Sequence, residues 1–200
     1  MGIRLHFYCV PPEGLRALIL EHIELFVVWF EDLQGEYPDE FPADVLHLAK
    51  QIERDGVAAL HATTSEQAAL VDNFVMFFCV DFDNNYAFLK SASESWIKSY
   101  HYRDCRLWLE VHCSPASEKL WMFMLEGRGI ERNSEQLPFE YEPHERGSIA
   151  YWTAQECIAM LHELMPLTIS EAEPTFCVRI VREALQTVVD QQASMLILVN

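Results

Sequence analysis

The sequence is poor in glycine, with 7 in 200 residues, and it lacks the glycine motifs that bind phosphate or expose a nucleophile. G-x-x-x-x-G-K, G-x-G-x-x-G and G-x-S-x-G are all absent, and each needs glycine where the backbone turns sharply or approaches a ligand. Gly127-Arg-Gly129 is short and is typical of a helix end. The chain therefore shows no motif of a P-loop NTPase, a Rossmann dinucleotide-binding enzyme or an α/β-hydrolase.

Basic residues are also scarce, with 14 Lys and Arg against 31 Asp and Glu and a net charge of −17. Sequence-independent nucleic-acid binding requires a basic surface that releases counterions, and anionic membranes also attract basic surfaces. The composition therefore argues against nucleic-acid and membrane partners. It is compatible with a basic protein partner, and equally with charge that serves solubility alone.

Long hydrophobic runs and a secretory signal are absent. Four polar residues interrupt the most apolar stretch, Leu15–Phe30, so it does not read as a membrane span. The first residues read as a strand, with no small-residue cleavage site behind a short apolar core. We therefore expect a cytoplasmic protein.

Six cysteines are present but none forms a C-x-x-C pair, so neither a zinc ribbon nor a thioredoxin-type motif is indicated. Reduced thiols are expected in the cytosol. The richest group of potential ligands, His101–Cys105 with His112 and Cys113, matches no standard zinc spacing. Asp81-x-Asp83-x-Asn85 begins like a calcium loop, but Tyr86 and Ala92 replace the required glycine and glutamate. We expect a turn at residues 81–85, no metal and no cofactor.

The clearest structural signals lie in the last fifty residues. Thr153-Ala-Gln-Glu156 is a capping box, and the helix that follows is expected to run over Ala154, Ile158, Leu161 and Met165 and to end near Pro166. Ser170–Glu173 repeats the signature before Pro174. The next helix carries an apolar stripe formed by Val178, Val181, Leu185 and Val188.

Residues 195–199 form an apolar run too short for a helix, which predicts a buried strand. The best partner is the segment 5–10 at the other end of the chain. We predict that the two termini meet in one small sheet. The expected fold is a helix-rich α+β single domain that spans residues 1–200.

A long helix should follow the first strand. Its buried face is predicted to consist of eight residues and to end before Gly35: Leu15, Leu18, Ile19, His22, Ile23, Phe26, Phe30 and Leu33. From residue 25 on the helix is apolar nearly all round, so Val27, Val28 and Trp29 could form a dimer surface. Glu13–Asp44 holds nine acids and one base, Arg16, which suggests an acidic face near residues 31–44.

The middle of the chain is less clearly patterned. We expect a helix over residues 45–52 that stops near Gly56, and a helix cap at Thr64–Gln67. Residues 68–80 read as helix at their start and as strand at their end. A helix is predicted to start near Ser91 or Ser93, and 107–113 to form a strand. Residues 115–125 then read as a helix or as the second arm of a hairpin. Residues 130–147 read as an exposed acidic loop.

One stretch interleaves aromatic and basic residues in an otherwise acidic chain. Its candidate binding residues are Trp96, Tyr100, His101, Arg103 and Asp104. Such a set can cradle an anion or stack on a planar ring. The alternative is a half-buried amphipathic element whose arginines pair with the surplus carboxylates.

The opening residues 1–15 and the closing segments 181–185 and 193–200 resemble the YfbM-like group of bacterial domains, as does Ile149–Glu156 as a helix entry. That family has no activity to carry over, so the resemblance implies no catalytic residues. Our leading hypothesis is a non-enzymatic, cytosolic interaction protein, such as an immunity-type inhibitor, whose acidic face meets a basic partner. The alternatives are a small-molecule-binding protein or enzyme with a pocket near residues 96–106, and a homodimer formed through the first helix.

Overall fold

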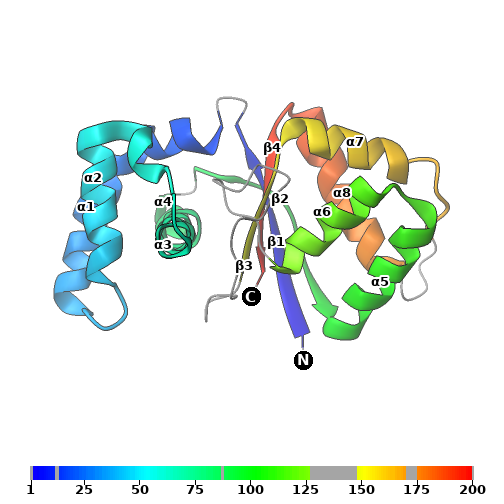
Figure 1. Cartoon of the computed structure of the whole chain (residues 1–200), viewed down its shortest axis with the longest axis horizontal. Coiled ribbons are helices and arrows are strands. Elements are labelled where there is room, and N and C mark those ends of the chain that lie inside the picture. Colours follow the sequence, from blue (N-terminus) through cyan, green and yellow to red (C-terminus); the bar gives the residue numbers. More distant parts are fainter. Residues whose placement is uncertain (1, 12–13, 87, 127–147, 170–174, 200) are drawn as a thin grey trace. The chain divides into compact units, whose positions relative to one another are not determined.

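The computed structural model describes residues 2–11, 14–86, 88–126, 148–169 and 175–199. These residues form two compact units (Figure 1). The sheet unit contains the described residues of ranges 1–12, 90–128 and 142–200, and the helical unit contains those of range 13–89. Because compact units of one chain can still fold together, the single domain over residues 1–200 stays a prediction.

The sheet unit holds all four strands of the described chain. They are β1 (Gly2–Val10), β2 (Lys90–Lys98), β3 (Ser148–Trp152) and β4 (Ser194–Val199), in the order β2-β1-β4-β3. Every neighbouring pair is antiparallel, and the pairing of β1 with β4 joins the two ends of the chain. The predicted helix-rich α+β fold with both terminal strands in one small sheet is therefore confirmed.

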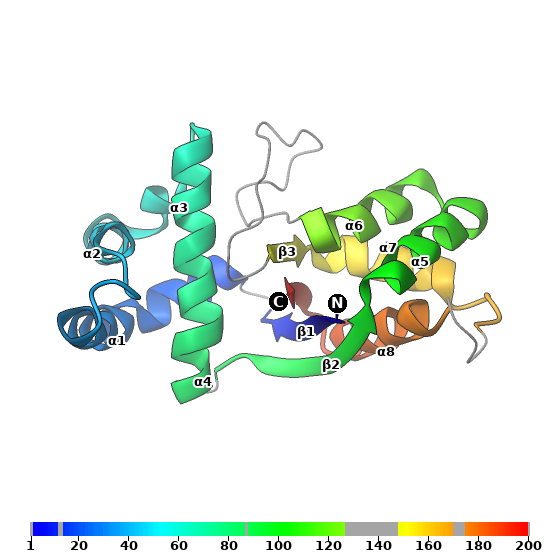
Figure 2. The ribbon, with the colours of Figure 1, turned by 90° about the horizontal axis from the view of Figure 1, so that it is seen from below.

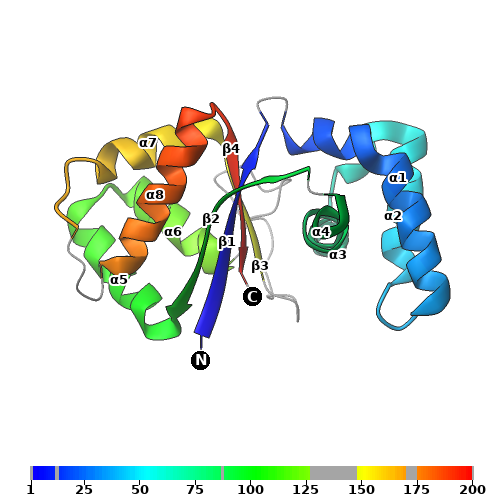
Figure 3. The same ribbon diagram turned by 180° about the vertical axis from the view of Figure 1, so that it is seen from behind.

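Four helices of the sheet unit lie on one side of this sheet (Figures 2 and 3). They are α5 (Ser99–His112), α6 (Pro115–Glu126), α7 (Ala154–Leu164) and α8 (Phe176–Asp190). The predicted capping box is present, because the Thr153 hydroxyl accepts the Glu156 amide while the Glu156 carboxylate accepts the Thr153 amide. The apolar stripe of α8 is buried as predicted.

The buried face of α7 includes only Leu161 of the four residues that marked this helix in the sequence. Cys157, Met160, Leu161 and Leu164 are buried, whereas Ile158 and Met165 are exposed. Both sets recur at helical spacing, so the sequence pattern was compatible with either face. Packing against α8 and β4 decides between them.

The helical unit runs from α1 (Leu15–Glu36) and α2 (Ala43–Asp55) through the short 3-10 helix η1 (Gly56–Leu60) to α3 (Ser65–Met76). The wide helical turn η2 (Phe77–Phe82) and α4 (Asp83–Tyr86) continue α3. The caps predicted at Thr64 and Gly56 are confirmed. Contrary to the prediction, α1 continues through Gly35 to Glu36.

An aromatic cluster forms the core of the helical unit. Phe26 of α1 lies at its centre, with ring centroids of five other aromatic side chains between 5.2 and 5.6 Å away: Trp29, Phe30, Phe74, Phe78 and Phe82. Phe78 belongs to the segment 68–80, whose end read as a strand, and Phe82 belongs to the predicted turn 81–85. Because helical spacing brings both rings onto Phe26, residues 77–82 are helical and not extended.

Residues 81–85 are also helical, which corrects the predicted turn. Asx residues favour turns through local hydrogen bonds, but here Asp83 uses its carboxylate differently. It accepts the Leu89 amide at 2.7 Å, after the helix has ended. The buried Phe82 ring holds the segment in the helix, so tertiary packing outweighs the local turn preference.

Two further predictions in the middle of the chain are wrong. Residues 90–98 form strand β2 instead of starting a helix, because they pair along nearly the whole of β1. Residues 107–113 lie in and after helix α5 instead of a strand. Cys105 and Leu109 are buried at a four-residue interval, whereas Leu107 and Val111 are exposed, so the alternation in this stretch does not mark a sheet face.

The remaining predictions, for residues 107–126 and for the segments on either side of strand β3, are tested only in part. The helix predicted over residues 115–125 is confirmed as α6, and the rival hairpin is wrong, because the preceding residues end helix α5 instead of forming a strand. Ile149–Trp152, expected as a helix entry, is strand β3, and the helix starts only after Thr153. The predicted loop 130–147 and the predicted cap Ser170–Glu173 lie outside the described residues.

Candidate functional site

The predicted binding stretch is divided between two elements of the sheet unit. Trp96 lies in β2, opposite Arg4 of β1, and Tyr100, His101, Arg103 and Asp104 lie in the first half of α5. The side chains of Trp96, Tyr100 and His101 are outside the described part of the structure. The helix expected to start near Ser91 or Ser93 therefore begins only at Ser99, after Trp96.

The two described side chains of this set form an exposed ion pair. The Arg103 guanidinium lies 3.8 Å from the Asp104 carboxylate, and the Arg103 side chain is 77% exposed. Ion pairs in this setting contribute little, because water screens both charges. By their described contacts, these two residues do not form an enclosed binding site.

The next turns of α5 present apolar side chains to solvent. Val111 is 77% exposed and Leu107 is 56% exposed. Beside them the rings of Trp108 and His112 stack at 4.3 Å, and the His112 Nδ1 atom lies 2.8 Å from the Trp108 carbonyl oxygen. This patch was not singled out in the sequence, because residues 107–113 were expected to alternate across a strand.

A polar row follows one face of β1 and continues onto β2. Arg4 donates two hydrogen bonds to the Glu94 carboxylate, at 2.8 and 2.6 Å, and His6 Nδ1 lies 3.8 Å from the other Glu94 oxygen. Burial lowers the pKa of His6, Glu94 opposes this effect and Arg4 adds to it. A mostly neutral imidazole can accept a proton. The neighbouring Glu94 carboxylate is less available to assist it, because Arg4 already binds one of the two Glu94 oxygens.

The Ser114 hydroxyl lies in hydrogen-bond contact with a carboxylate. Its Oγ donates to Glu163 at 2.7 Å, and the same carboxylate accepts the Ser114 amide at 2.8 Å. Desolvation raises the pKa of Glu163, but hydrogen bonds from Ser114 and Ser117 outweigh it and hold the pKa below its usual value. Such a carboxylate is a weak base, so the contact is better suited to fixing the start of α6 than to activating Ser114.

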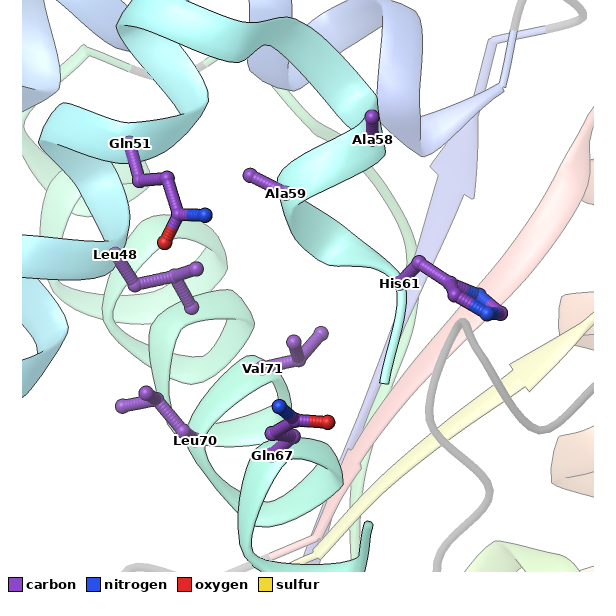
Figure 4. A pocket seen from close by; sticks show the side chains of 8 residues that line it. All are labelled: Leu48, Gln51, Ala58, Ala59, His61, Gln67, Leu70 and Val71. Atoms are coloured by element: carbon purple, nitrogen blue, oxygen red, sulfur yellow. The ribbon is translucent and has the colours of Figure 1, made fainter. Parts of the chain in front are cut away.

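A cavity of about 240 Å³ lies in the helical unit between α2, η1 and α3. Its lining consists of Leu48, Gln51, Ala58, Ala59, His61, Gln67, Leu70 and Val71. Figure 4 shows the amides of Gln51 and Gln67 directed into the space, whereas the His61 ring points away from it. The Gln67 Oε1 atom already accepts two amides and one hydroxyl from Thr63 and Thr64. The cavity therefore offers amide donors over an apolar floor, and none of its residues belongs to the 96–106 stretch.

Exposed acidic residues gather on the first helix of the helical unit and on the loop that follows it. Eight acids between residues 21 and 44 are all exposed: Glu21, Glu24, Glu31, Asp32, Glu36, Asp39, Glu40 and Asp44. On α1, residues 17, 20, 21, 24, 25, 28, 31 and 32 are exposed at steps of three and four, so they share one face of the helix. We call this face together with the loop to α2 the acidic surface.

Apolar side chains are set among these acids. Val28 is 58% exposed and lies one turn from Glu24 and from Asp32, and Leu20 and Leu25 are each 43% exposed. Lys50 of α2 forms an ion pair with Glu31 at the edge of the surface. Among the described residues, Glu21, Glu24 and Asp32 have no hydrogen-bond or ion-pair partner. Their carboxylates are therefore available to a binding partner.

The described residues contain no cluster of three or more His, Cys, Asp or Glu side chains that could hold a metal ion. Within the same residues, no helix is both long and apolar enough to cross a membrane. No protein-family model, no curated protein and no solved structure matches the chain. The resemblance to YfbM-like domains therefore stays a prediction, and the functional argument rests on the surfaces described above.

Proposed function

We propose that the protein is a non-enzymatic binding protein whose acidic surface docks onto a basic protein. The observation that carries this proposal is the face of α1 on which unpaired carboxylates surround the exposed Val28 side chain. Carboxylates steer a basic partner over long distances and set its orientation, and a central apolar contact slows its dissociation. An immunity-type inhibitor of a basic toxin or enzyme is one protein of this kind.

The charges on α1 oppose the stability of their own helix. Glu36 lies in the last turn, where the helix dipole is negative, and no basic residue compensates it there. Asp32 and Glu36 are four residues apart, a spacing at which like charges repel each other. A surface that retains destabilising charges is typical of a binding role, because function is maintained at the expense of stability.

The same charges argue against a homodimer through this face. Val27 is buried and Trp29 contacts the aromatic core, so only Val28 of the three residues considered for a dimer is well exposed. Because Glu24 and Asp32 flank Val28, two copies would bring like charges together. A basic partner would remove this repulsion, whereas a second copy would increase it.

The test compares two variants of equal net charge. The surface variant carries Glu21→Gln, Glu24→Gln and Asp32→Asn, and the control carries Glu110→Gln, Glu183→Gln and Asp190→Asn in the sheet unit. Each protein is immobilised and exposed to extract of the source cell at low salt, and bound proteins are quantified by mass spectrometry. We expect basic proteins to bind the unchanged chain and the control, to leave at high salt, and to be lost from the surface variant.

Equal capture by both variants would contradict the proposal, since net charge alone would then explain binding. Calorimetry with a purified captured protein gives its affinity for the unchanged chain and for each variant. A captured protein whose binding is insensitive to salt would also contradict it, because carboxylate-steered association weakens as ions screen the charges.

A further inference from the structure

The cavity between α2, η1 and α3 contains one side chain whose hydrogen-bonding role is fixed by the fold. The Gln67 Oε1 atom accepts the amides of Thr63 and Thr64 at 2.9 and 3.2 Å, and the Thr63 hydroxyl at 2.9 Å. Since a backbone amide can only donate, the oxygen of Gln67 must face the two threonines. Its Nε2 atom has no hydrogen-bond partner among the described residues. Gln67 therefore offers a ligand donors but no acceptor.

Gln51 of α2 supplies both a donor and an acceptor to the same space. Figure 4 shows its amide group directed into the cavity that Gln67 faces from α3. Within the described part of the chain, the Gln51 side chain is exposed and has no hydrogen bond or ion pair. A free primary amide carries N–H and C=O side by side, so it makes two hydrogen bonds to a ligand edge that presents C=O beside N–H. Cyclic amides and imides have such an edge.

The rest of the lining limits the size and the charge of a ligand. Leu48 and Val71 are 6% and 3% exposed and form an apolar floor, while Ala58 and Ala59 occupy little of the space. None of the lining residues is an acid, a lysine or an arginine, so an ion would lose water there without gaining a counter-charge. A volume of about 240 Å³ equals that of roughly eight water molecules in the liquid, which suits one six-membered ring.

We propose that this cavity binds a small, neutral cyclic imide. The ring N–H and one carbonyl pair with the Gln51 amide, the second carbonyl accepts from Gln67 Nε2, and the ring carbons lie on Leu48 and Val71. We expect a Kd of about 1–10 mM, because such a ligand has few atoms and keeps part of its surface in water. None of the acids of the acidic surface lines the cavity, so this binding is separate from the docking of a basic protein.

The probe is glutarimide, and three related compounds each lack one of its features. N-methylglutarimide lacks the N–H, δ-valerolactam lacks the second carbonyl, and glutarate is an open-chain anion. Binding is followed at neutral pH by the shifts of assigned amide signals in the NMR spectrum of the isotope-labelled full-length protein. With glutarimide we expect saturable shifts at Gln51, Ala59 and Gln67. The affinity should be about fivefold lower for each of the two neutral analogues, and glutarate should give no saturable shift.

The variant Gln67→Glu separates binding from folding. A carboxylate at this position accepts the same amides of Thr63 and Thr64, and glutamate is as suitable as glutamine in a capping box, so the Tm should be maintained. The variant lacks the Nε2 donors and turns an oxygen towards the ligand carbonyl, so glutarimide should bind at least about tenfold more weakly. Gln155→Glu makes the same charge change at an exposed position of α7 and should leave binding unchanged.

The four compounds decide the question on the unchanged chain even where a variant fails to fold. The proposal is overturned if glutarimide causes no saturable shift at the residues of the cavity, or if N-methylglutarimide or glutarate binds as tightly as glutarimide. Equal affinity of the unchanged chain and a folded Gln67→Glu variant would also overturn it, because the ligand would then not contact the Nε2 atom.

Discussion

Replacing Phe26 by alanine tests whether the aromatic cluster is the core of the helical unit. The ring is 0% exposed and has five aromatic neighbours with centroids between 5.2 and 5.6 Å. Truncating a buried phenylalanine typically costs about 3–5 kcal/mol, because the free energy gained by burying the ring is lost and a cavity remains. Because Phe26 has many ring contacts, we expect the loss for Phe26→Ala to lie towards the upper end of this range. In a chain of this length, that loss should lower the Tm by roughly 10 °C.

Guanidinium unfolding followed by circular dichroism and tryptophan fluorescence gives the free energy of unfolding. The matched control is Val28→Ala, two residues away on the same helix, where the side chain is 58% exposed. That change removes little buried area and gains helix propensity, so we expect an effect within about 0.5 kcal/mol. A loss below about 1 kcal/mol for Phe26→Ala, or equal losses for both variants, would refute the role assigned to the cluster.

Hydrogen exchange on the same variant also tests the single domain predicted from the sequence. If residues 1–200 unfold together, Phe26→Ala should speed exchange of the slowest amides in β1 and β4 as much as in α1 and α3. Faster exchange confined to the helical unit would contradict the single-domain prediction and leave the core assignment intact.

Three further predictions concern local features of the fold. Gly56 has a φ of 72° whereas Gly35 is helical, and an added Cβ meets no atom within 4 Å at either position. Gly35→Ala should therefore stabilise the chain and Gly56→Ala destabilise it, each by about 1 kcal/mol in thermal unfolding; the same sign for both would contradict the backbone argument. Thr153→Ala should cost about 1 kcal/mol because the capping box is lost, whereas Thr153→Ser should restore most of it in the same assay. The pKa of Glu163 lies below the usual 4.5, so the unfolded chain binds more protons there. Glu163 therefore stabilises the fold above pH 4.5, and this contribution is lost as the pH falls through the folded pKa. Glu163→Gln should make the Tm less dependent on pH in this acid range. An unchanged dependence of the Tm on pH would contradict the stabilising contact between Glu163 and Ser114 at the start of α6.

Features that depend on neighbours in the chain could be predicted from the residues alone. The capping boxes at Thr64 and Thr153 follow from the reach of one side chain over three residues, and the apolar stripe of α8 follows from the helical period. The two apolar terminal strands were also predictable, because each is too short for a helix and needs a partner. The acidic surface was visible as a local excess of carboxylates, although its position on one face of α1 required the burial pattern.

Features that depend on residues far apart in the sequence required the folded chain. Residues 90–98 are a strand because β1 offers them an edge, and residues 77–82 stay helical because Phe78 and Phe82 reach Phe26. The buried face of α7 likewise depends on packing against α8. In each case the local pattern allows two structures of similar energy, and the free energy of burying side chains against a distant element selects one of them.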